Sequence, residues 1–323
     1  RRSSDLIAAG YPALGALLAA ETGAGMGMPW LVLAGGGYSE TRGHVTPTRV
    51  ERTMDLEELA SPNVYANGSA NFYTEAEHDA IVKARAARLG RLIDGDPRQG
   101  ARASMERVAW ARAHAHQLGT LMDAIESGPN VSMPPNTNTT RTARRIFESG
   151  FIALAAYEQG LSRAGVMSVG SFDTHAEHDS SHPWQLQNVL LGVDGLMQEA
   201  ASRNIDMVIL ITSEFGRTAT YNVANGKDHW PVTSWMLLQT AGLDVITPGR
   251  VVGASHYDES SQQILARDLD LNSLATGEVA GQSPLSPGLC HIGLRKRLGI
   301  DQGMLADHHY PLVGPDVSKV FTG

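Results

Sequence analysis

The alternation of helical and apolar segments from Thr142 onward constrains this chain more than any other feature. The sequence predicts a helix over about 142–161, a strand over 164–170, a helix over about 184–203 and a strand over 206–212. The last strand has an unbroken apolar centre, which is typical of a strand buried on both faces of a sheet. Strand, helix and strand with short connections imply a parallel sheet with right-handed crossovers. We therefore expect an α/β fold, with a mainly parallel central sheet flanked by helices.

The N-terminal half adds one more strand and a helical region. The sequence predicts a helix from about Pro12 to Glu21 and a strand over Met28–Ala34, followed by a glycine-rich loop over Gly35–Gly43. The loop lacks the lysine of a Walker motif and the glycine spacing of a dinucleotide-binding fingerprint. A tight turn is therefore favoured over a phosphate-binding loop. Residues 44–75 are polar and predict a long surface excursion. Residues 75–126 predict a helical insertion, divided near 94–97, within a single domain that spans 1–323.

Shorter elements complete the C-terminal part. The sequence predicts strands over Trp235–Gln239 and Val251–Ala254, the second at a sheet edge, and a helix over Pro287–Leu298.

Composition excludes several classes of protein. The chain has 323 residues, 42% hydrophobic and 19% charged, which is an ordinary globular composition. The net charge of −8 argues against a nucleic-acid or anionic-membrane surface. One cysteine, Cys290, excludes an intrachain disulfide and a cysteine-based zinc cluster. No apolar run approaches the roughly 20 residues of a membrane span. The chain is compatible with a homo-oligomer, but its sequence does not determine the oligomeric state.

The first residues bear on localisation. The chain opens with Arg1-Arg2-Ser3, without an initiator methionine and without an apolar signal segment. We interpret it as a mature or trimmed chain from which an export signal has been removed. The expectation is a periplasmic or secreted protein.

Metal-ligand side chains gather directly after the strand at 164–170. The stretch Gly170–His178 contains Asp173, His175 and His178. Carboxylates and imidazoles suit zinc, manganese, iron or magnesium. In an extended segment Asp173 and His175 point the same way, because side chains repeat every second residue. We favour a metal site over a solvated strand end, with His178 as a neighbour only.

Two later segments carry matching chemistry. Glu214 and Arg217 follow the strand at 206–212, where a buried unpaired acid would be costly, so a metal or Arg217 must compensate it. A simple Glu214–Arg217 ion pair closing a loop explains this segment equally well. Asp228 and His229 lie about 14 residues further on, and alone they would suggest a surface pair. Carboxyl ends of strands are where open α/β sheets place their chemistry, which favours convergence of all three segments.

The motifs Phe172-Asp-Thr-His175, Ser213-Glu-Phe-Gly-Arg-Thr218 and Gly226-Lys-Asp-His-Trp230, in this order, resemble the bacterial DUF1501 family. The resemblance is specific over about 165–260 and weaker over 1–60. It implies a relation to the alkaline phosphatase and sulfatase superfamily, with a mainly parallel sheet and a two-metal site.

The resemblance also implies roles for the residues that match. Asp173, His175 and His229 would hold one metal, and Glu214 would help to hold a second. Arg217 and Asp228 would orient ligands or substrate. The superfamily's first-strand aspartate and nucleophile have no counterpart before Pro29, so we infer that the N-terminal part of the fold is missing here. The sulfatase Cys-x-Pro-x-Arg signature is absent, and Phe215 stands where a phosphatase has the histidine of its Asp-His pair.

We therefore expect a metal-dependent hydrolase of phosphate or sulfate esters, with one or two divalent ions, zinc first, and a small anionic ester as substrate. Arg217 would then stabilise charge developing on the substrate oxygen. The alternative is a non-catalytic secreted or surface protein that keeps the sheet for binding or assembly. Nucleotide binding through Gly35–Gly37 fits poorly, because no phosphate-binding lysine follows.

Overall fold

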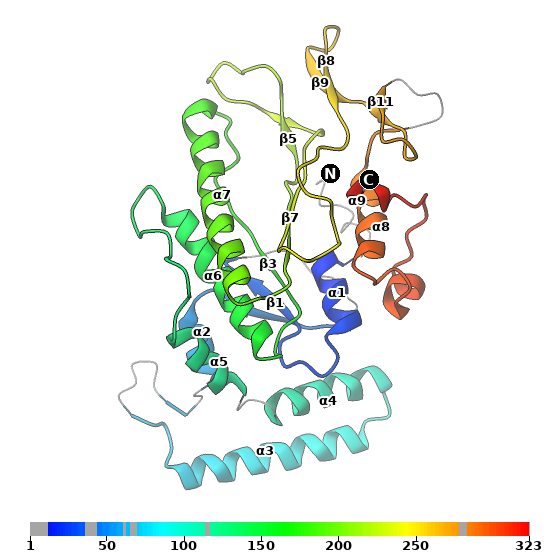
Figure 1. The fold of residues 1–323 in the computed structure, drawn as a ribbon. Helices are drawn as coiled ribbons and strands as arrows, with labels where there is room; N and C mark the ends of the chain where they lie inside the picture. The colour runs from blue at the N-terminus through cyan, green and yellow to red at the C-terminus, as the bar shows by residue number, and fades with distance from the viewer. Residues whose placement is uncertain are drawn as a thin grey trace.

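A computed structural model describes residues 12–35, 44–60, 63–64, 70–113, 117–277 and 283–322. Residues 36–43 of the predicted glycine-rich loop lie outside this part of the chain. The described elements form a mixed α/β structure (Figure 1).

Three parallel strands form the sheet at the centre of the N-terminal half. β1 (Trp30–Leu33) lies between β2 (Pro47–Val50) and β3 (Ala164–Met167), with Trp30 opposite both Pro47 and Ala164. The predicted strands at 28–34 and 164–170 are therefore confirmed in shortened form. The predicted surface excursion over 44–75 is wrong in part, because it contains β2 and α2 (Thr53–Ala60). β2 escaped detection because it is a sheet edge of mixed composition, with Val50 as its one buried residue.

β1 is buried on both faces, and its residues alternate between two cores. Leu31 and Leu33 pack into one core with Ile152 and Ala155 of α6 (Arg141–Glu158) and with residues of α2 and α5 (Gln117–Glu126). Trp30 and Val32 pack on the opposite face, against α1 (Leu14–Thr22). Side chains of a strand point to alternate faces, so four consecutive apolar residues hold helices on both sides. The predicted helices at 12–21 and 142–161 match α1 and α6.

The second half of the chain departs from a parallel sheet. β4 (Val208–Ile211) pairs antiparallel with β7 (Met236–Gln239). Within the described part of the chain, the predicted parallel arrangement therefore holds only for the three strands β1, β2 and β3. Between β4 and β7 the chain reverses through the short antiparallel pair β5 (Gly216–Arg217) and β6 (His229–Trp230). An apolar run predicts burial but carries no information on strand direction, which the connection decides.

Small antiparallel pairs and helices complete the C-terminal part of the fold. They are β8 (Ser255–Asp258) with β9 (Gln263–Ala266), β10 (Asp268–Leu269) with β11 (Thr276–Gly277), α8 (Pro287–Arg297), the π-helical turn η2 (Leu305–His309) and α9 (Lys319–Thr322). The predicted strand over Val251–Ala254 is wrong, because β8 begins directly after it. The predicted helix from Pro287 matches α8, which Ser286 caps through its side chain.

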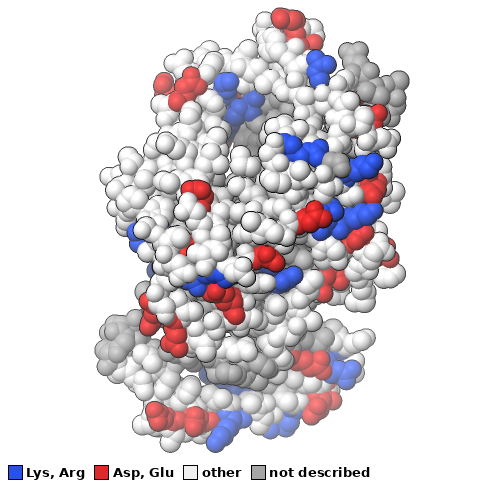
Figure 2. All heavy atoms as spheres, in the orientation of Figure 1, with Lys and Arg blue, Asp and Glu red and all other residues white. Residues whose placement is uncertain are grey.

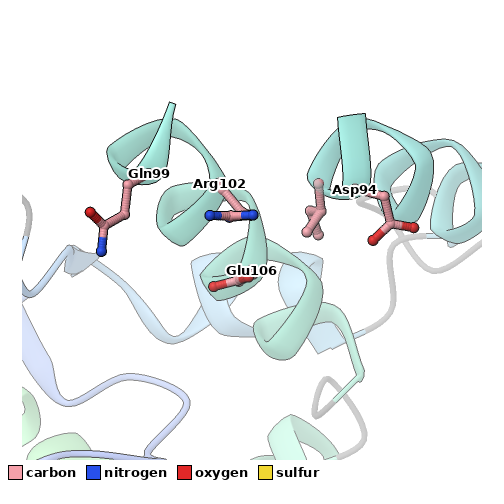
Figure 3. A pocket seen from close by; sticks show the side chains of 5 residues that line it. Asp94, Gln99, Arg102 and Glu106 are labelled. Atoms are coloured by element: carbon pink, nitrogen blue, oxygen red, sulfur yellow. The ribbon is translucent and has the colours of Figure 1, made fainter. Parts of the chain in front are cut away.

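The described residues of the region 75–126 form three helices, α3 (Glu75–Gly95), α4 (Gln99–Ala113) and α5, and the break after α3 lies where the sequence places it. α3 begins with a capping box from Thr74 and Glu77 and has no fully buried residue. An open pocket of about 530 Å³ lies between the end of α3 and the start of α4, and Ile93 and the polar side chains labelled in Figure 3 line it. Figure 2 shows acidic and basic side chains interspersed over this face of the molecule, including its lower edge where α3 lies. No helix among the described residues combines the length and the apolar character needed to cross a membrane.

α6 and α7 (His178–Ser202) pack so closely that glycine is required between them. A Cβ at Gly192 of α7 would lie 2.6 Å from the carbonyl oxygen of Ala143 and 2.8 Å from Cβ of Ile146. We expect Gly192→Ala to lower the free energy of unfolding by about 1–3 kcal/mol, because overpacking forces the two helices apart.

The matched control is Gly90→Ala in α3, where a Cβ meets nothing within 4 Å. Alanine should stabilise this helix by about 0.5–1 kcal/mol through its better helix propensity. Urea unfolding of both variants checks the pair of expectations, and an unchanged Gly192→Ala variant would contradict the close packing.

Candidate metal centre

Two loops dock against each other where α7 begins. One is the segment 170–177 between β3 and α7, and the other is the loop 218–228 between β5 and β6. The backbone N–H of Lys227 donates to the carbonyl of Thr174, and the N–H of His178 donates to the carbonyl of Asn225. A Cβ on Gly226 would overlap the carbonyl group of His175, so the two backbones approach at a distance that glycine alone permits. This docking brings the first and third sequence motifs together.

Three of the predicted metal ligands converge at this junction. Asp173, His175 and His229 present ligand atoms that all lie within 4.8 Å of one another, and among the described residues they form the group suited to a metal ion. Oδ1 of Asp173 lies 3.0 Å from Nε2 of His175 and 2.8 Å from Nε2 of His229. The two Nε2 atoms are 3.2 Å apart. One carboxylate oxygen and two imidazole nitrogens therefore face a common point.

Asp228 holds the far side of the His175 ring. Its Oδ1 lies 2.8 Å from Nδ1 of His175, and the amide of Asn222 donates to the same oxygen at 3.2 Å. These two hydrogen bonds, that of His175 first, lower the pKa of the Asp228 carboxyl group. The carboxylate is thus ionised near neutral pH and accepts a hydrogen bond from the N–H at Nδ1 of His175. A carboxylate behind a histidine fixes its tautomer, as in metal sites where the other nitrogen binds the ion.

Arg217 uses its guanidinium group to hold the two loops of the site together. Its Nη2 donates to the carbonyl of Phe172 at 2.6 Å and to Oδ1 of Asp173 at 2.8 Å, and its Nη1 donates to the carbonyl of Lys227 at 2.8 Å. The guanidinium therefore joins both loops, and its side chain is only 9% exposed. Hydrogen bonds from Arg217 and then from His229 lower the pKa of Asp173 to about 2. This geometry favours an orienting role for Arg217 over direct contact with a substrate.

The ring of His229 is fixed by packing. Phe215 stacks on it with ring centroids 3.7 Å apart and an interplanar angle of 16°. His229 lies directly opposite Arg217 in the β5–β6 pair, so one short pair of strands positions both side chains. Phe215 is therefore an aromatic support for the ring of His229.

The structure does not bring every predicted residue to the site. Glu214 is solvent-exposed and lies outside the metal-ligating group of the described residues. His178 turns to Thr174, whose Oγ1 lies 2.6 Å from its Nδ1, and stacks on His182. Its position as a neighbour of the site matches the sequence interpretation.

Asn222 is the residue that sequence reasoning missed. Its side-chain oxygen accepts from the N–H groups of Ala224 and Gly226, and its amide donates to the carbonyl of His175 and to Asp228. It therefore organises the tight loop and ties it to the segment 170–177. The available signal was local, since Asn222 begins an Asn-x-x-Asn-Gly turn sequence.

The spacing of the three ligand atoms is compatible with a metal ion such as zinc. Ligands about 2.0–2.1 Å from zinc at tetrahedral angles lie about 3.3–3.4 Å apart. The three ligand atoms here are 2.8–3.2 Å apart, so a displacement of a few tenths of an ångström suffices. The three ligand side chains are solvent-exposed, so a metal ion held by them would be reachable from solvent.

The lowered pKa of Asp173 gives a pH dependence of stability. A carboxyl group whose pKa is about 2 in the folded state and near 3.8 when unfolded stabilises the fold above pH ~3.8, and this contribution is lost as pH falls toward 2. In metal-free protein the stability difference between wild type and Asp173→Asn should shrink as pH is lowered from 5 to 3. Urea unfolding at several pH values measures it, and a difference independent of pH would contradict the proposed hydrogen bonds.

Comparison with known proteins identifies the family. The family model described as "Protein of unknown function (DUF1501)" matches residues 4–276, well over half of the chain. No curated protein and no solved structure matches the chain significantly. The chain belongs to the DUF1501 family.

Proposed function

We propose that this protein is a metal-dependent hydrolase of phosphate or sulfate esters, with one divalent ion held by Asp173, His175 and His229. The observation that carries the proposal is the contact between Oδ1 of Asp173 and Nε2 of His175 at 3.0 Å. With the proton of His175 on Nδ1, facing Asp228, a neutral ring presents a lone pair on Nε2. Two acceptors then face each other, and a cation between them removes the repulsion.

A proton on Nε2 of His175 is the competing way to satisfy this contact. Such a proton occupies the lone pair that a metal needs, so metal and proton compete for one position. The charge balance also favours a cation, because the junction holds two carboxylates, Asp173 and Asp228, against the single guanidinium of Arg217. We propose zinc first, because one carboxylate and two imidazoles suit it.

A divalent ion here would supply a Lewis acid that polarises an ester oxygen and acidifies a water nucleophile. The protein's own residues would orient the ligands. Asp228 fixes the tautomer of His175 through its hydrogen bond to Nδ1. Phe215 fixes the orientation of the His229 ring by stacking on it. The hydrogen bond from Arg217 keeps Asp173 ionised. Because Glu214 lies outside the metal-ligating group, the proposal involves one ion.

Two wider proposals accompany this one. The order and type of the ligands support a relation to the alkaline phosphatase and sulfatase superfamily, which would make a small anionic ester the substrate. A periplasmic or secreted location fits that relation. Both proposals rest on the resemblance of the three motifs.

The second candidate function is non-catalytic binding or assembly on the same scaffold. The exposure of the three ligands favours it, because the side chains of Asp173, His175 and His229 are 61%, 48% and 48% exposed. Hydrolytic sites gain from excluding bulk water, and this one is open. A metal would then have a structural or adhesive role.

Metal binding is the first test. Purified protein freed of metal should bind one zinc ion per chain in calorimetry, and the affinity should fall as pH is lowered, because protons compete with the metal for the ligand nitrogens. His175→Ala and His229→Ala should each abolish this binding. His308→Ala, with its side chain 73% exposed in η2, is the matched control and should bind as wild type.

Turnover separates the two candidate functions. Hydrolysis of an aryl phosphate or aryl sulfate by the zinc-loaded protein, lost in His175→Ala and kept in His308→Ala, would support the hydrolase. Zinc binding without turnover across the panel would favour the binding protein. Absence of zinc binding by the wild type would overturn the metal centre itself.

The role of Asp228 gives a separate test. Asp228→Asn keeps the shape of the side chain but removes the charge behind His175. We expect zinc affinity to fall about 10–100-fold, because a carboxylate behind a ligating histidine fixes its tautomer and raises its basicity. Calorimetry measures the change. Unchanged affinity would show that Asp228 does not act through His175.

A further inference from the structure

A second polar site lies at the carboxyl ends of the parallel strands. A cavity of about 150 Å³ opens where β1 and β3 end, and the first turns of α6 and part of α7 complete its wall. Its lining includes Arg145, Thr142, Ser168, Ser171 and Gln185. None of the ligands of the metal centre lines it. Ligands of α/β folds bind at the carboxyl ends of the parallel strands, so the position of this cavity is typical of a ligand-binding site.

Hydrogen bonds to the residues that follow β1 and β3 position Arg145 at this cavity. Its Nη2 donates to the carbonyl of Ala34, directly after β1, at 2.8 Å and to that of Ser168, directly after β3, at 3.5 Å. Both bonds to described residues come from one nitrogen. A guanidinium has five N–H donors in a fixed fork, so Nε and Nη1 keep donors for a ligand. Arg145 is solvent-exposed, which lets a ligand reach it.

The backbone of the wall is strained where it meets the cavity. Ala34 has φ +49° and Ser171 has φ +71°, both in the left-handed region that residues with a Cβ rarely adopt. Such strain costs about 1–3 kcal/mol per residue and gathers at ligand sites. Gln185 steadies this wall, since its buried side chain donates to the carbonyl of Gly170 at 2.9 Å.

The chemistry of the lining selects the ligand. Arg145 carries the one charge among the described lining residues, and hydroxyl groups of Thr142, Ser168 and Ser171 accompany it. Cationic forks and hydroxyls recognise oxyanions. The cavity is smaller than the roughly 300–1,000 Å³ of pockets for drug-sized ligands. It therefore suits a small anion or the anionic end of a larger molecule.

We propose that the cavity at the ends of β1 and β3 binds a small tetrahedral oxyanion of the phosphate or sulfate class, held by Arg145 and Ser171. The site goes beyond the hydrolytic function proposed above and does not depend on a metal. It shares the segment 168–173 with the metal centre, because Ser171 lines the cavity and Asp173 lies two residues further on.

Calorimetric titration of wild-type protein in EDTA with inorganic phosphate, sulfate and acetate tests the proposal. We expect phosphate or sulfate to bind, and Arg145→Ala to weaken that binding at least about tenfold through loss of the charged fork. Arg144→Ala is the matched control on the same helix, because Arg144 pairs with Glu148 instead. It should bind as wild type.

Ser171→Gly provides a second test of the proposed site, which applies even if Arg145→Ala fails to fold. Glycine accepts the positive φ without strain, so this variant should fold at least as well as wild type while binding the anion a few-fold more weakly. Failure of wild type to bind either tetrahedral anion, equal binding by Arg145→Ala, or equal binding by Ser171→Gly would each overturn the proposal. Acetate binding stronger than phosphate and sulfate would overturn the assigned ligand class. Because EDTA removes divalent metals, none of these outcomes depends on the metal centre.

Discussion

The close approach of Gly226 to the backbone of His175 is the constraint on which the candidate site depends. It lets the loop between β5 and β6 lie flat against the segment that precedes α7, with backbone hydrogen bonds from Lys227 and His178 across the junction. His175 stands on one side of this junction and His229 on the other. The two imidazoles can therefore meet although 54 positions separate them in the sequence. A side chain at position 226 would part the loops and, with them, the ligands.

Charge compensation explains the rest of the local arrangement. Two carboxylates, Asp173 and Asp228, lie at opposite nitrogens of His175, and Arg217 bonds to only the first. A site of this kind carries more negative than positive charge when its histidines are neutral. The pKa values of both carboxyl groups are lowered by their hydrogen bonds, so the imbalance persists over the neutral range. We propose that a divalent cation at the three ligand atoms offsets this excess of negative charge.

Sequence alone predicted the local chemistry better than the long-range arrangement. Periodicity placed α6, and the apolar runs placed β1, β3 and β4, because burial leaves a direct trace in composition. The direction of β4 against β7 left no such trace. β2 was not predicted, because it is an edge strand that contains polar residues. Asp173, His175 and His229 could be named together because they follow strand ends and match a family pattern, and the structure brings them together.

The contacts that the supporting residues make could not be predicted from the sequence, for a physical reason. Asn222 and Phe215 act through contacts that depend on loop geometry and ring orientation, which spacing does not encode. Glu214 was an expected ligand because burying an acid after an apolar strand is costly, but Glu214 is exposed to solvent, so that cost does not arise. α7 begins at His178, earlier than predicted, so the connection that meets Gly226 ends at Glu177.

A crystal of the protein grown with zinc, with diffraction measured on both sides of the zinc absorption edge, tests the central claim most directly. The account predicts one anomalous peak per chain, about 2.0–2.1 Å from Oδ1 of Asp173 and from Nε2 of both His175 and His229. An anomalous map with no peak between these three atoms, or with zinc bound only elsewhere, would contradict it.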